Sequence, residues 1–120
     1  MPDHEARWVE RCRRIGTEKL RLWGMPSLID DAQLLISELV TNGLQHGDGS
    51  SDLGVRFVVT AGRLLVAVED GSPGKAQVRH AAAHDEAGRG MFLVAALATQ
   101  WGVSPDGSTT WFSLAVEGRS

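Results

Sequence analysis

Cysteine is almost absent from this sequence of 120 residues. Cys12 is the only one, so an intramolecular disulfide and a cysteine-based zinc site are both excluded. Cys12 is therefore expected to be a small apolar residue on a helix. His80 and His84 are four residues apart, but no third ligand accompanies them, and we expect no metal site there.

Long apolar runs are also missing. No stretch is long enough to cross a bilayer, and the N-terminal residues lack the apolar segment of a signal peptide. We therefore expect a cytoplasmic protein that has no membrane contact. The net charge of −3 argues against direct nucleic-acid binding. With 42% hydrophobic residues, the chain is expected to form one domain over residues 1–120 with a modest core.

Basic residues are concentrated in the first segment, which contains Arg7, Arg11, Arg13, Arg14, Lys19 and Arg21. Two interpretations are open: the segment serves an acidic protein partner, or it is the solvated face of a helix. The tryptophans Trp8, Trp23, Trp101 and Trp111 are expected to pack inside the fold. Exposure of Trp8 or Trp23 would instead indicate a partner surface on the first helices.

Apolar spacing predicts two helices at the start of the chain. The first runs from about residue 5 to 23, with Trp8, Cys12, Ile15, Leu22, Val9, Leu20 and Trp23 on or beside its core face. The second opens with Ser27 as N-cap and Asp30 completing a capping box, and it runs to about His46.

Strand patterns follow. Alternation over residues 53–60 and an apolar run over 64–69 predict a hairpin. Residues 75–87 are polar and alanine-rich and predict a lid loop. The next helix starts at Gly88-Arg89-Gly90 and is apolar on nearly every side, as a buried helix is; two more strands close the chain. This order predicts an α+β fold, a two-layer α/β sandwich with a mixed, mainly antiparallel sheet.

Three polar motifs interrupt these elements. Glu38 and Asn42 lie one helical turn apart, where an amide oxygen suits Mg²⁺ and a carboxylate can act on a hydroxyl. Asp70 ends a strand before Gly71-Ser72-Pro73-Gly74 and can accept the amine of an adenine. Glycines at a helix start leave amide groups open to phosphate, as at Gly88-Arg89-Gly90.

Each motif alone has an ordinary structural explanation: a helix edge, a turn or a hinge. Neither a Walker A sequence nor a Rossmann glycine pattern is present. In this order, however, the three motifs supply the metal, base and phosphate contacts of one Mg·ATP site.

The motifs resemble those of the histidine kinase-like ATPase (GHKL) superfamily, in its anti-sigma-factor serine/threonine kinase branch. Residues 38–47 resemble the N box of that branch, residues 68–73 the Ser-Pro form of its G1 box common in actinobacterial members, and residues 88–94 its G2 box. Thr109-Thr110-Trp111-Phe112 is similar to the closing strand. The resemblance extends from Ala6 to Val116 and implies a Bergerat-type ATP-binding fold.

By this resemblance the cofactors are ATP and Mg²⁺, and Asn42 holds the metal. Glu38 is implied as the catalytic carboxylate. The implied nucleotide contacts are Asp70, Ser72, Gly74, Gly88, Arg89, Gly90 and Thr110. Two residues depart from the pattern: Ser72 replaces a glycine, and Gly43 replaces an alanine, which weakens the helix by roughly 1 kcal/mol.

The resemblance implies a protein kinase that binds a sigma factor and phosphorylates a small anti-anti-sigma-type protein, with a homodimer possible. A catalytically silent interaction module is the alternative, and the retained Glu38 argues against it. A detached histidine-kinase catalytic domain is least favoured, because His4 is expected to lie in a disordered start of the chain, before the first helix, and so offers no convincing phosphoacceptor.

Overall fold

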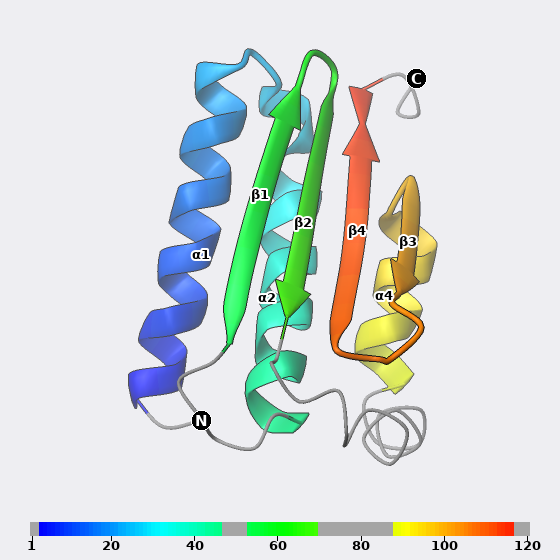
Figure 1. Cartoon of the computed structure of the whole chain (residues 1–120). Coiled ribbons are helices and arrows are strands. Elements are labelled where there is room, and N and C mark those ends of the chain that lie inside the picture. Colours follow the sequence, from blue (N-terminus) through cyan, green and yellow to red (C-terminus); the bar gives the residue numbers. More distant parts are fainter. Residues whose placement is uncertain (1–2, 47–52, 70–87, 117–120) are drawn as a thin grey trace.

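The computed structural model describes residues 3–46, 53–69 and 88–116 (Figure 1). Its first elements are α1 (Asp3–Leu22), the short 3-10 helix η1 (Pro26–Leu28) and α2 (Ile29–His46). They are followed by β1 (Gly54–Thr60), β2 (Arg63–Glu69), α4 (Gly88–Leu97), β3 (Gln100–Val103) and β4 (Thr109–Ala115). The predicted element order is confirmed, and the predicted lid at residues 75–87 lies outside the described part.

The strands form one sheet in the order β1-β2-β4-β3, and the helices all cover the same face of it (Figure 1). This is the predicted α+β sandwich of two layers. Each pair of neighbouring strands among the described residues is antiparallel. The parallel component of a mixed sheet is not found among these strands.

The core lies between the sheet and α2. Alternate residues of β2 and β4 point to the helices and are buried: Leu64, Val66, Val68, Phe112 and Leu114. The facing side of α2 supplies Ala32, Leu35, Ile36, Leu39 and Val40, as its apolar spacing predicts. The apolar residues that alternate along the strands and those at helical spacing along α2 therefore pack into one core.

The entry into α2 differs from the prediction. Ser27 lies inside η1, and α2 begins only at Ile29, so Ser27 is not its N-cap. Pro26 fixes the backbone at the start of η1, and the Leu28 amide donates to the Met25 carbonyl at 3.1 Å. Met25 and Leu28 are both buried, so tertiary packing holds this turn in place of a side-chain cap.

Several side chains assigned to the core are at the surface. Leu22 is 83% exposed, Trp23 52% and Trp101 40%. Leu22 follows Glu18 by one helical turn and so lies on the outer face of α1. The burial of residues 93–97 of α4 is described, and only Val94 among them is buried. The prediction of a helix buried on nearly every side is therefore wrong. A helix in a two-layer fold has one face against its neighbours and another in solvent.

Other predicted packing residues are in place. Cys12 is 1% exposed, as expected of a small apolar side chain. Burial raises the pKa of its thiol to about 11, with a smaller opposing effect from Arg11. The Trp111 indole lies against Gly102 on the neighbouring strand, where an added Cβ would be 2.9 Å from Nε1. Trp8 packs against the core.

Gly16 sets the distance between α1 and α2. A Cβ at this position would lie 2.6 Å from Ile36 Cδ1, which is closer than van der Waals contact allows. Ile36 is itself fully buried. A side chain at residue 16 would therefore force the end of the Ile36 side chain to move.

We expect Gly16→Ala to lower the free energy of unfolding by about 1 kcal/mol, because overpacking outweighs the gain in helix propensity. In an Ile36→Val background, which removes Cδ1, the same substitution should be neutral or stabilising. Urea denaturation of the four proteins of this double-mutant cycle measures the coupling. Additive effects would contradict the contact.

Candidate functional site

Glu38 and Asn42 lie together on one flank of α2, and both are half-buried. On the other flank, the Gln33 amide donates to the Thr17 hydroxyl of α1 at 2.9 Å. Asn42 follows Gln33 by two and a half helical turns, which places it on the opposite side of the helix. Because α2 lies between α1 and α4 (Figure 1), Glu38 and Asn42 are on the flank towards α4.

Asn42 Oδ1 is buried and has no hydrogen-bond partner among the residues that the structure describes. A buried acceptor without a partner costs about 1–3 kcal/mol. A neutral amide oxygen is also a suitable ligand for Mg²⁺. The side chain therefore fits the metal that the sequence motifs imply.

The last turn of α2 lies directly against the end of β2. A Cβ on Gly43 would be 3.0 Å from both Leu53 Cδ1 and Val68 Cγ1. Gly43 thus allows the turn that carries Asn42 to approach the strand end that precedes Asp70. The departure from alanine at this position has a packing reason that the sequence pattern did not reveal.

Thr110 reaches the same region from β4. It pairs with Val68 on one side and with Val103 on the other, so these three residues share the helix-covered face of the sheet. Thr110 is half-buried. Val68 therefore lies close to Gly43, the residue after Asn42, and also pairs with Thr110, the threonine predicted to approach the nucleotide.

The N-terminus of α4 lies at the same end of the molecule. The helix begins at Gly88, as predicted from Gly88-Arg89-Gly90. In Figure 1 the start of α4, the last turn of α2, the end of β2 and the start of β4 all lie at one end of the sandwich. The first amide groups of a helix have no partner within it and attract anions.

Asp70, Ser72 and Gly74 lie outside the described residues. The described part contains no cluster of three or more His, Cys, Asp or Glu side chains that could hold a metal ion. A cation beside Asn42 would therefore take most of its ligands from phosphate and water.

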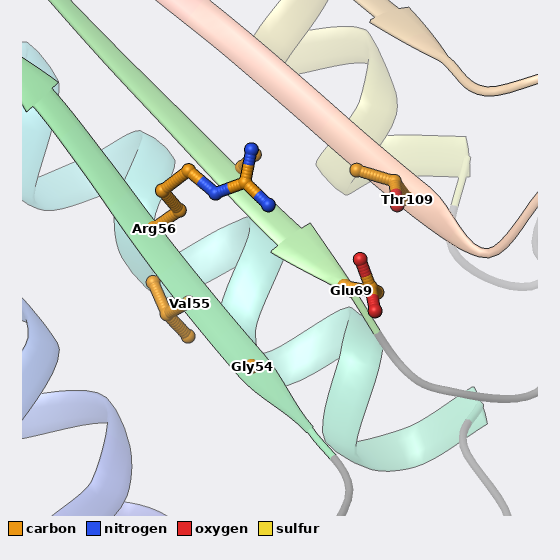
Figure 2. A pocket seen from close by; sticks show the side chains of 6 residues that line it. Gly54, Val55, Arg56, Glu69 and Thr109 are labelled. Carbon is orange, nitrogen blue, oxygen red and sulfur yellow. The ribbon is translucent and has the colours of Figure 1, made fainter.

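A hollow lies on the other face of the sheet. This pocket, of about 280 Å³, is lined by Gly54, Val55, Arg56, Ala67, Glu69 and Thr109. Figure 2 shows the Arg56 side chain extended across β2 above the sheet, with Glu69 and Thr109 at the strand ends. The sheet itself separates this pocket from Asn42 and Thr110, so the pocket is not part of the predicted site.

A family model of the histidine kinase-like ATPase domain matches residues 4–114. The chain belongs to this family. No curated protein matches it. Membership identifies the chain as an ATP-binding domain of the GHKL type and agrees with the α+β fold. None of the described helices is long and apolar enough to cross a membrane.

The unpaired oxygen leads to a stability prediction. Asn42→Leu should raise the free energy of unfolding of the nucleotide-free protein by about 1 kcal/mol, because it removes a buried acceptor that has no partner. Thermal and urea denaturation without nucleotide measure this change.

Gln33→Leu is the matched control, since it removes an amide of the same helix that does have a partner, Thr17. It should lower stability by about 1 kcal/mol. A similar loss in both variants would show that the Asn42 amide is bonded in solution.

Proposed function

We propose that this domain binds Mg·ATP at the α4 flank of α2 and acts as a serine/threonine protein kinase that regulates a sigma factor. The main support is the buried, unpartnered Oδ1 of Asn42 in a histidine kinase-like ATPase domain. An acceptor that is costly in the free protein is favourable once it binds a cation.

Each predicted residue has a separate part in this proposal. Asn42 holds Mg²⁺, and Asp70 accepts a hydrogen bond from the exocyclic amine of adenine. Ser72 and Gly74 lie beside the base, and Thr110 approaches the nucleotide from β4. Gly88, Arg89 and Gly90 bind the phosphates through helix amides and the guanidinium group.

Glu38 is proposed as the catalytic carboxylate. It lies one helical turn before Asn42 on the same flank and is half-buried. In the proposed reaction ATP supplies the γ-phosphoryl group. Glu38 accepts the proton of the attacking serine hydroxyl, the new bond forms to the serine oxygen, and ADP leaves.

The protein partners follow from the family resemblance alone. A small anti-anti-sigma-type protein would provide the serine, and a sigma factor would be sequestered. A homodimer and a cytoplasmic location belong to the same proposal. The alternative is an interaction module that binds ATP, or only its partner, without phosphoryl transfer.

Calorimetric titration with ATP, with and without Mg²⁺, tests the nucleotide site. The wild-type chain should bind more tightly with Mg²⁺, and Asn42→Ala should remove this Mg²⁺-dependent gain. Asp70→Asn should weaken binding by about tenfold or more with and without the metal, since it mismatches one buried hydrogen bond.

The two variants control for each other, because one changes the metal contact and the other the base contact. Unchanged Mg·ATP affinity in both would refute the site assignment. If the wild-type chain does not bind millimolar ATP, the domain is a nucleotide-independent interaction module.

Phosphoryl transfer is tested with Glu38→Gln, which keeps the size of the side chain and removes its basicity. Incubation with labelled ATP and an anti-anti-sigma-type protein should label a serine in the wild-type reaction. The variant should lose about 100-fold or more of this rate and retain ATP affinity. Equal rates would show that Glu38 is not the base, and absence of transfer by wild type would favour the silent module.

A further inference from the structure

The solvent face of α1 carries a straight row of arginines. Arg7, Arg11, Arg14 and Arg21 are all exposed, and two exposed acids, Glu10 and Glu18, lie among them. Their spacing of three, four and seven residues keeps them on one side of the helix. The buried residues of α1, among them Val9, Cys12 and Leu20, occupy the other side.

Most of this positive charge is not neutralised within the described part of the chain. The ion pair described on α1 joins Arg13 and Glu10 at 3.5 Å. Arg11, Arg14 and Arg21 form no ion pair with a described residue. The protein as a whole has a net charge of −3, so a positive row here is a local feature rather than a general excess of charge.

Apolar side chains lie where this row ends. Leu22 is 83% exposed and lies one turn after Glu18 on the same face. Trp23 follows at 52% exposure. Trp23 is two residues after Arg21 and three after the buried Leu20, so it lies on a different side of α1 from the arginines. Exposure of Trp23 was expected to indicate a partner surface on the first helices, and Trp23 is exposed.

We propose that Arg7, Arg11, Arg14, Arg21 and Leu22, the arginine surface, bind an acidic amphipathic helix of a partner protein. The carboxylates of the partner would pair with the guanidinium groups, and its apolar side chains would cover Leu22. From Arg7 to Arg21 the row is about 21 Å long, at 1.5 Å per residue. A partner helix of about four turns matches that length.

A protein partner fits this surface better than a lipid bilayer. Membrane-bound amphipathic helices insert a whole apolar face, and the apolar face of α1 is already buried against the core. Glu18 within the row would oppose both anionic lipid and a nucleic-acid backbone. An acidic helix can instead place a polar or basic residue opposite Glu18.

The arginine surface is separate from the proposed nucleotide site. α1 covers one flank of α2 and α4 the other (Figure 1). Docking on α1 therefore leaves Asn42 accessible, and the inference goes beyond the proposed kinase function without depending on it.

A synthetic acidic helix is the probe. We would use a fluorescein-labelled peptide of about 18 residues, with glutamates at the same three- and four-residue spacing as the arginines and two leucines at one end. Fluorescence anisotropy with the full chain at low salt should show binding that weakens as salt rises. Arg11→Glu/Arg14→Glu should weaken it by about 100-fold, as both ion pairs become repulsive.

Arg56→Glu/Arg63→Glu is the matched control, because it makes the same charge change on the other face of the sheet, where both side chains are exposed. It should reduce binding by less than about threefold. Leu22→Ser should weaken binding by about threefold to tenfold without changing charge. Circular dichroism and ATP titration verify folding and show whether a defect lies in this surface or in the nucleotide site.

Three results would overturn the proposal. The first is absence of peptide binding at millimolar concentration. The second is an equal loss in the two double variants, which would mean that only net charge matters. The third is binding to anionic phospholipid vesicles or duplex DNA as tight as to the peptide, which would assign the surface to a membrane or a nucleic acid.

Discussion

α2 packs against the sheet, α1 and α4 at once, and this packing determines the rest of the structure. Its apolar face covers β2 and β4, while α1 and α4 lie along its flanks. Each fully buried leucine or isoleucine on that face contributes about 1.5–3 kcal/mol. Glycines occur at two of the tightest approaches, Gly16 between α1 and α2 and Gly43 between α2 and the end of β2. The sites on either flank depend on this arrangement.

Within this packing, Asn42 carries a local cost that the proposed metal contact would offset. Replacing Asn42 by an apolar residue would suit the helix better, since Oδ1 is buried without a partner. Sites that bind ligands commonly retain such unfavourable groups in the free protein. Gly43 has the opposite character: its helix propensity is poor, but its lack of a side chain brings the Asn42 turn against Val68. Neither residue is explained by the stability of α2 alone.

The sequence allowed the element order, the core face of α2 and the helix start at Gly88 to be predicted, because these depend on local periodicity. It also allowed Glu38 and Asn42 to be placed on one flank. Features that depend on tertiary contacts were missed. Ser27 has the composition of a cap, but the packing of Met25 and Leu28 decides how α2 begins.

One further error and one feature that was not foreseen have the same origin. Leu22 is apolar and near the core in sequence, but its angular position on α1 matches that of Glu18. The packing role of Gly43 depends on Val68, a residue of another element that only the folded chain brings close. Sequence patterns describe one element at a time, and both cases depend on what the element faces.

A hydrogen bond and a close-packed contact hold α2 against α1. Gln33 bonds Thr17 at 2.9 Å, and Ile36 fills the space above Gly16. A close-packed contact of this kind leaves little room for α1 to slide on α2 without displacing it. The helix that carries Asn42 on its far side is therefore packed closely against α1. In this fold the glycine that permits the tight helix pair also lets Ile36 of α2 fill the space beside α1.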